Sequence, residues 1–63
     1  MIYTHADFWI DPKTGATWHA LKARNGAGVF DQLSMGVLRD FEVSRTLEWC
    51  KSHNMIISDR RAA

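Results

Sequence analysis

The sequence predicts a small α+β domain in which an N-terminal β-hairpin is followed by two short α-helices and a possible short third strand. Three observations lead to this class: a Pro/Gly turn between two β-rich segments, a helical spacing of apolar residues after it, and a capping serine further on. The chain has 63 residues, which suits a single domain over residues 1–63. We divide it into a hairpin over residues 2–23, a helical part over residues 30–54 and a polar tail over residues 58–63.

The hairpin is predicted by the turn sequence Asp11-Pro12-Lys13-Thr14-Gly15. Pro12 fixes φ for the second position of a turn, and Asp11 can accept hydrogen bonds from the turn backbone. Gly15 supplies a left-handed residue that returns the chain. A loop over residues 12–15 places Asp11 opposite Ala16, so the numbers of paired residues sum to 27.

This register divides the hairpin side chains between two faces, because neighbours along a strand alternate. The apolar face, which we expect to join the core, carries Ile2, Ala6, Phe8, Ile10, Leu21 and Ala23, with Thr4, Thr17 and His19 at its margin. The opposite face carries a cross-strand pair of tryptophans among polar residues: Tyr3, His5, Asp7, Trp9, Asp11, Trp18, Ala20 and Lys22.

The segment after the hairpin is predicted to break the chain and then to form a helix. Asn25-Gly26-Ala27-Gly28 is typical of a flexible connection. Apolar residues then fall at the i, i+3, i+7, i+8 and i+11 positions of an amphipathic helix, at Phe30, Leu33, Val37, Leu38 and Phe41. The alternative is a loop as far as Gly36 followed by a strand over residues 37–43.

A second helix is predicted over residues 45–53. Ser44 has the side chain of an N-cap, and Asn54 can end the helix in a left-handed conformation. The apolar run Met55-Ile56-Ile57 predicts either the third strand or a core plug. The predicted core comprises Ile2, Phe8, Ile10, Leu21, Phe30, Leu33, Val37, Leu38, Phe41, Leu47, Cys50 and Ile56.

Composition excludes several classes of protein. The chain has eight Lys and Arg residues and seven Asp and Glu residues, so its charges nearly balance. This balance argues against an acidic mimic of nucleic acid. The chain also lacks the basic excess of a dedicated nucleic-acid binder. Residues 1–7 show no signal peptide, and no apolar stretch approaches the roughly 20 residues of a membrane span. Cys50 is the only cysteine, so no internal disulfide can form and a cytoplasmic location is expected.

We expect no catalytic site, no metal site and no cofactor. A zinc site needs three or four converging ligands, but in the predicted register His19 points away from His5 and Asp7. Cys50 and His53 supply only two ligands, and as a catalytic dyad they lack an orienting third group and an oxyanion hole. The sequence therefore predicts a protein that is not an enzyme.

The tryptophan face is the predicted binding site. If the apolar face packs on the helices, Trp9 and Trp18 lie at the surface within a charged rim, a composition typical of protein interfaces. The predicted partner-binding residues are Trp9, Trp18, Tyr3, His5, Asp7 and Lys22. One rival interpretation is that the pair only stabilises the hairpin. The other is that the helices cover both faces, or that the tryptophan face is the buried one.

A protein partner is therefore expected. A chain of this kind would act as a small inhibitor or adaptor of a larger complex, a role for which phage and mobile-element proteins are often this size. A homodimer that buries the tryptophan face on itself is a further alternative.

Residues 36–53 also resemble a helix-turn-helix, with Phe41-Glu42-Val43-Ser44-Arg45-Thr46 similar to the turn that opens many recognition helices. The resemblance implies a small DNA-binding regulator with a helix-turn-helix-like segment over residues 37–53. The residues that would face nucleic acid are Arg39, Arg45, Thr46 and Lys51. The rival interpretation is two helices joined by a serine-capped corner.

Overall fold

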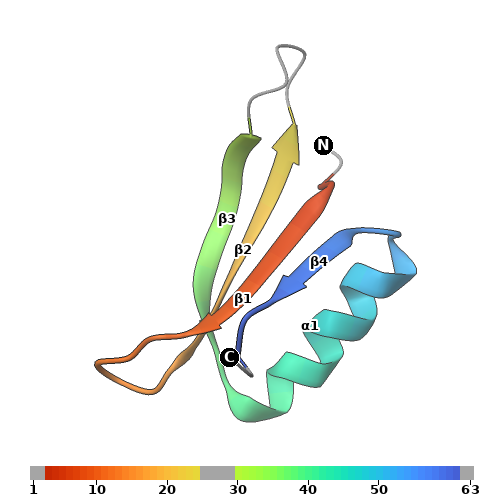
Figure 1. Cartoon of the computed structure of the whole chain (residues 1–63). Coiled ribbons are helices and arrows are strands. Elements are labelled where there is room, and N and C mark those ends of the chain that lie inside the picture. The colour runs from red at the N-terminus through yellow and green to blue at the C-terminus, as the bar shows by residue number, and fades with distance from the viewer. Residues whose placement is uncertain (1–2, 25–29, 62–63) are drawn as a thin grey trace.

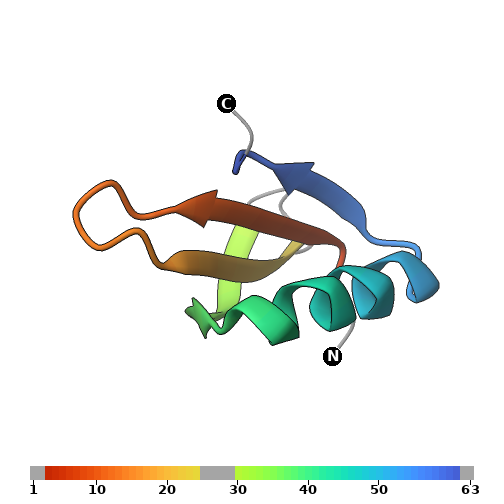
Figure 2. The same cartoon turned by 90° about the horizontal axis from the view of Figure 1, so that it is seen from below.

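A mixed four-stranded sheet with one helix on one of its faces forms the described part of the chain (Figures 1 and 2). The computed structural model describes residues 3–24 and 30–61, with the backbone alone for residues 30–33. The elements in chain order are β1 (His5–Ile10), β2 (Thr17–Arg24), β3 (Phe30–Leu38), α1 (Asp40–Ser52) and β4 (Ile56–Asp59). The strand order across the sheet is β3-β2-β1-β4. The α+β class is confirmed, whereas the prediction of two helices is wrong.

The predicted hairpin is confirmed in its loop and in its register. β1 and β2 pair antiparallel with Trp9 opposite Trp18 and Phe8 opposite His19. The Asp11 carboxylate accepts a hydrogen bond from the Lys13 N–H at 2.9 Å, and Gly15 has a φ of 74°. The turn chemistry alone therefore sets which side chains share a face.

The helix predicted from residue 30 is wrong, because Phe30–Leu38 is strand β3, antiparallel to β2. The alternative of a loop followed by a strand over residues 37–43 is wrong as well. Leu21 pairs with Ser34 but Lys22 pairs with Gln32, so Leu33 is a bulged residue. The bulge shifts by one position the alternation of side chains between the two faces of the strand. The apolar residues before and after the bulge therefore have a spacing that resembles that of a helix. Pairing also gives β2 its second neighbour, without which an isolated hairpin is marginal.

Helix α1 begins earlier than predicted. Asp40 opens it, and Ser44 lies exposed inside it rather than at its N-cap. The Glu42 carboxylate accepts a hydrogen bond from the Arg39 N–H at 3.0 Å, and the two acidic residues of the first turn complement the positive end of the helix dipole. These contacts, and not an N-cap at Ser44, mark the start of the helix.

The end of α1 agrees with the prediction for Asn54, which has a φ of 56°. The Asn54 N–H donates to the Lys51 carbonyl and the Met55 N–H donates to the Cys50 carbonyl. These two bonds form a Schellman motif, and the buried Met55 and Cys50 side chains belong to the same core cluster.

The predicted third strand is present as β4, which lies parallel to β1 at the edge of the sheet. Ser58 and Asp59, which were predicted to belong to a polar tail, are part of this strand. The Arg60 N–H continues the pairing by donating to the Phe8 carbonyl at 2.8 Å. Because β3 and β4 are the two edges of the sheet, α1 crosses from one edge to the other over the face that it covers (Figure 1).

The core lies between the sheet and α1. Its buried cluster comprises Ala6, Phe8, Leu21, Cys50 and Met55, with Tyr3, Leu38, Leu47 and Ile57 packed against it. Four residues predicted to belong to the core are exposed instead: Ile10, Val37, Phe41 and Ile56. Val37 and Ile56 pair with Trp18 and His5 and so lie on the other face of the sheet, while Phe41 points outward from the first turn of α1. Three further predictions fall outside the described part of the chain: the core position of Ile2, the linker at residues 25–28, and the side chains of Phe30 and Leu33.

Candidate functional site

The face of the sheet opposite α1 is covered by no described element (Figure 2). We call it the open face. The strand register assigns its members from all four strands: His5, Asp7, Trp9, Trp18, Ala20, Lys22, Arg24, Met35, Val37, Ile56 and Ser58. Because cross-strand partners project to the same side, these residues form one continuous surface.

Trp9 and Trp18 form the centre of the open face. Their ring centroids are 6.3 Å apart and their planes are inclined by 13°, within the range of offset-stacked aromatic pairs. Both side chains are half-buried. The guanidinium carbon of Arg60 lies over the Trp9 ring, 5.7 Å from its centroid, which is a cation–π distance. The result is a row of three flat groups across the sheet.

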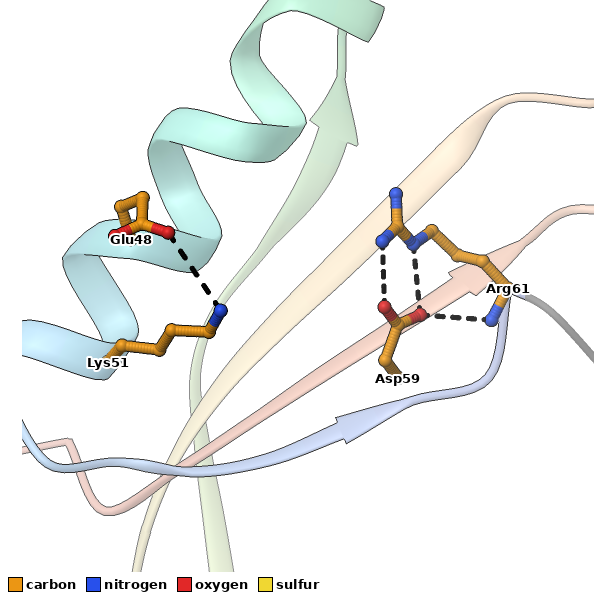
Figure 3. Close-up of polar contacts among 4 residues, drawn as sticks. All are labelled: Glu48, Lys51, Asp59 and Arg61. Carbon is orange, nitrogen blue, oxygen red and sulfur yellow. Dashed lines mark hydrogen bonds and ion pairs between the residues drawn. The ribbon is translucent and has the colours of Figure 1, made fainter.

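Arg60 is held at this row by the residues on both sides of it in the chain. The backbone N–H of Arg60 donates to the Phe8 carbonyl of β1. The Arg61 side chain donates two hydrogen bonds to the Asp59 carboxylate, from Nε at 2.9 Å and from a terminal nitrogen at 2.7 Å (Figure 3). These bonds lower the pKa of Asp59 to about 2. The end of β4 is therefore fixed where Arg60 can reach Trp9.

An ion pair lies beside the tryptophan row. The Lys22 ammonium is 2.6 Å from an Asp7 carboxylate oxygen, across the two central strands, and both side chains are partly buried. Ala20 is the cross-strand partner of Asp7, and it is buried although it is on the open face. Larger neighbours therefore close over the centre of this surface.

Apolar side chains flank the row on the outer strands. Met35 and Val37 of β3 are 52% and 53% exposed, and Ile56 of β4 is 63% exposed. Single exposed apolar residues are ordinary, but several on one face around an aromatic centre are typical of an interaction surface.

The structure brings together five of the six residues predicted to bind a partner, namely Trp9, Trp18, His5, Asp7 and Lys22. Tyr3 lies elsewhere, because it packs against the core and makes an edge contact with Trp49 of α1 at 6.3 Å.

Sequence reasoning missed the outer members of the open face. Met35 and Val37 were hidden by the helix assigned to their segment, although their spacing of two residues is that of one strand face. Arg60 was hidden in the assumed tail. A strand assignment extending past Ile57 would have carried the alternation to it.

The residues of the nucleic-acid alternative lie on or next to α1. Arg39 precedes the helix, and Arg45, Thr46 and Lys51 lie along it. Lys51 is 3.8 Å from Glu48 (Figure 3). The two-helix geometry implied by the resemblance is wrong, since Val37 and Leu38 belong to β3 and one uninterrupted helix follows.

No group of three or more His, Cys, Asp or Glu residues within the described part of the chain could hold a metal ion. Cys50 is fully buried, and burial raises the pKa of its thiol. His53 is exposed and stacks on Trp49 with centroids 4.2 Å apart. The thiol therefore behaves as a small apolar group rather than as a nucleophile.

Comparison of the chain with protein families, with curated proteins and with solved structures found no match. Among the described residues, no helix is long and apolar enough to cross a bilayer. The site must accordingly be interpreted from its own chemistry.

Proposed function

We propose that this protein is a non-enzymatic protein-binding module that docks on its partner through the open face. The observation that supports the proposal best is the contrast between the two faces of the sheet. One face carries the core under α1, while the other keeps the Trp9–Trp18 row and exposed Met35, Val37 and Ile56 without a cover among the described residues.

The composition of the open face agrees with that of measured interfaces. Tryptophan and arginine are, with tyrosine, enriched among binding hot spots, and here Trp9, Trp18 and Arg60 lie in one row. Polar groups beside the row are already paired, as in Lys22–Asp7. Docking would therefore bury few unsatisfied charges.

The size of the open face suits a small, reversible interface. Four strands about 4.8 Å apart and about six residues long give a footprint of roughly 19 by 20 Å. Because side chains project from the sheet, the accessible area of the open face is larger than this flat footprint. Such a face suits the smallest specific interfaces, which bury about 1,200 Å² in total over the two partners. A module of this size acts by occupying a surface of a larger complex, as an inhibitor or adaptor does, and its single cysteine suits a reducing cytoplasm.

The test is affinity capture of the partner by the tagged chain, with nuclease present, comparing variants that keep the fold. Met35→Gln combined with Val37→Thr removes apolar surface from the open face with little change in shape. We expect this double variant to lose the partner at least tenfold, about 1.4 kcal/mol. Phe41→Gln, at a position on α1 that is 65% exposed, is the matched control and should keep the partner.

Thermal melts of all variants confirm that the fold is intact. Retention of the partner by the double variant, or loss of all captured material on nuclease treatment, would contradict the proposal.

A further inference from the structure

We propose that the partner presents an acidic and apolar protein segment, with a carboxylate seated on Arg60. This inference rests on the proposed function and specifies the chemistry of the group that the open face takes.

Charge is divided unequally between the two sides of the molecule. Among the described residues, the open face and Arg60 beside it carry three cationic side chains, Arg60, Lys22 and Arg24, against one carboxylate, that of Asp7. Helix α1 on the other side carries three acidic residues, Asp40, Glu42 and Glu48, against Arg45 and Lys51. A chain with a net charge of only +1 therefore presents a positive open face, and complementary charge favours an acidic partner.

Arg60 is the cation best prepared for a carboxylate. Lys22 is paired with Asp7, Lys51 with Glu48 and Arg61 with Asp59, whereas the described contact of the Arg60 side chain is with an aromatic ring. A guanidinium that lies over a ring at a cation–π distance still has five N–H donors, and their fork matches the two oxygens of a carboxylate. The contact with the ring also orders the side chain before binding, which lowers the entropic cost of docking.

A second copy of this chain is a poorer occupant. Two open faces packed on each other would oppose like charges, which disfavours the contact.

A nucleic acid is a poorer occupant too, although it is anionic. Lys22 is engaged by Asp7, which leaves few cations for phosphates. Arg60 and Trp18 already contact the Trp9 ring, which leaves less of that ring for stacking on bases.

The edges of the sheet also favour docking on the face. β3 carries the bulge at Leu33 and β4 has only four residues. Bulges and very short strands are features that oppose the addition of a further strand.

The experiment selects random twelve-residue peptides on the immobilised chain. The best peptide and a copy in which Asp and Glu are replaced by Asn and Gln are then titrated into the ¹⁵N-labelled chain. We expect selected peptides to combine carboxylates with apolar residues, to shift resonances of the open face, and to bind about tenfold more tightly than the amide copy. Arg60→Gln should reduce binding of the acidic peptide to the level of the amide copy, while Arg45→Gln on α1, the matched loss of a cation, should leave both unchanged.

The outcomes separate this inference from the proposed function. One outcome would be peptides that contain no carboxylate, bind the open face, and bind more weakly to the double variant Met35→Gln with Val37→Thr. That outcome would overturn the inference and leave the proposed function standing. Failure of every selected peptide to shift the open face would overturn both. A twelve-nucleotide oligothymidine that binds more tightly than the acidic peptide, or a dimer in ultracentrifugation that Arg60→Gln strengthens, would also overturn the inference.

Discussion

The ion pair between Asp59 and Arg61 helps to position a residue that takes no part in it. Their side-chain bonds fix the chain immediately around Arg60, and Arg60 in turn covers Trp9. The arrangement of the row formed by Arg60, Trp9 and Trp18 therefore depends on a carboxylate that is not itself part of the row.

The pH dependence of this contact can be measured. The pKa of Asp59 is lowered to about 2 by its bonds from Arg61, below the usual value near 3.9. A carboxyl whose pKa is lowered on folding contributes stability above pH 4 and loses it as the pH falls towards 2. The contribution is small because the pair is about one-third exposed. Carboxyl NMR should follow Asp59 titrating near pH 2, and Arg61→Ala should return its pKa towards 3.9; an unchanged midpoint would show that Arg61 is not the cause.

Cys50 should report the opening of the core. Its side chain is fully buried and burial raises the pKa of the thiol, so little thiolate forms and no reagent reaches it in the folded state. We expect a thiol reagent to modify native protein at a rate set by unfolding, slower by orders of magnitude than in denaturant. Rapid modification under native conditions would mean that α1 separates readily from the sheet.

At the scale of the elements, the sequence predicted what local chemistry determines. Asp11 and Gly15 fixed the hairpin turn, its register and hence the two faces, and Asn54 fixed the end of the helix. The strand β3 was missed because its bulge at Leu33 conceals the alternation. Its pairing with β2 is a tertiary contact that outweighs a helical pattern.

The candidate site was predictable to the same extent. The hairpin supplied Trp9, Trp18 and their polar neighbours, because one register relates them all. Arg60 and the apolar residues of β3 depend on strands that pair only in the folded sheet. No local signal marks a parallel strand formed beside β1 by residues some fifty positions away.

The two glycines described in the strands and turns should respond oppositely to alanine. Gly36 lies in β3, where an added Cβ would meet only His19 at 3.8 Å, an ordinary contact. We expect Gly36→Ala to stabilise the fold by about 0.5–1 kcal/mol, since it reduces the entropy of the unfolded chain. Gly15→Ala should destabilise by about 1 kcal/mol, because its φ of 74° disfavours a side chain. Urea melts of both variants measure their free energies of unfolding. If both substitutions changed that free energy in the same direction, the prediction would be contradicted.

The start of α1 leaves room for a stronger cap. Arg39 has the extended φ and ψ of an N-cap residue, −73° and 156°, but no side-chain oxygen. Arg39→Ser should therefore stabilise the chain by about 1 kcal/mol. Ser44→Ala should be nearly neutral because Ser44 is inside the helix and exposed; if Ser44→Ala proved the costly change, the helix would start where the sequence first suggested.

The stability of the whole molecule rests on a small core. A domain of 63 residues has a free energy of unfolding of roughly 3–9 kcal/mol. Phe8 is the largest fully buried side chain among the described residues, and Phe8→Ala should cost about 3–5 kcal/mol, which is a large fraction of that free energy and should lower the melting temperature markedly. Ile10→Ala, two positions along the same strand but 44% exposed, should cost far less. Circular dichroism melts measure both, and equal losses would show that the core does not centre on Phe8.

The position of β1 between β2 and β4 has a consequence for the order of folding. β1 pairs with β2 across a short turn, but it pairs with β4 across some fifty positions of the chain. Contacts between residues far apart in the sequence form more slowly than local ones, so we expect the hairpin to form before β4 docks. Until β4 docks, the outer edge of β1 is unpaired, and an unpaired strand edge in a folding intermediate is prone to aggregate.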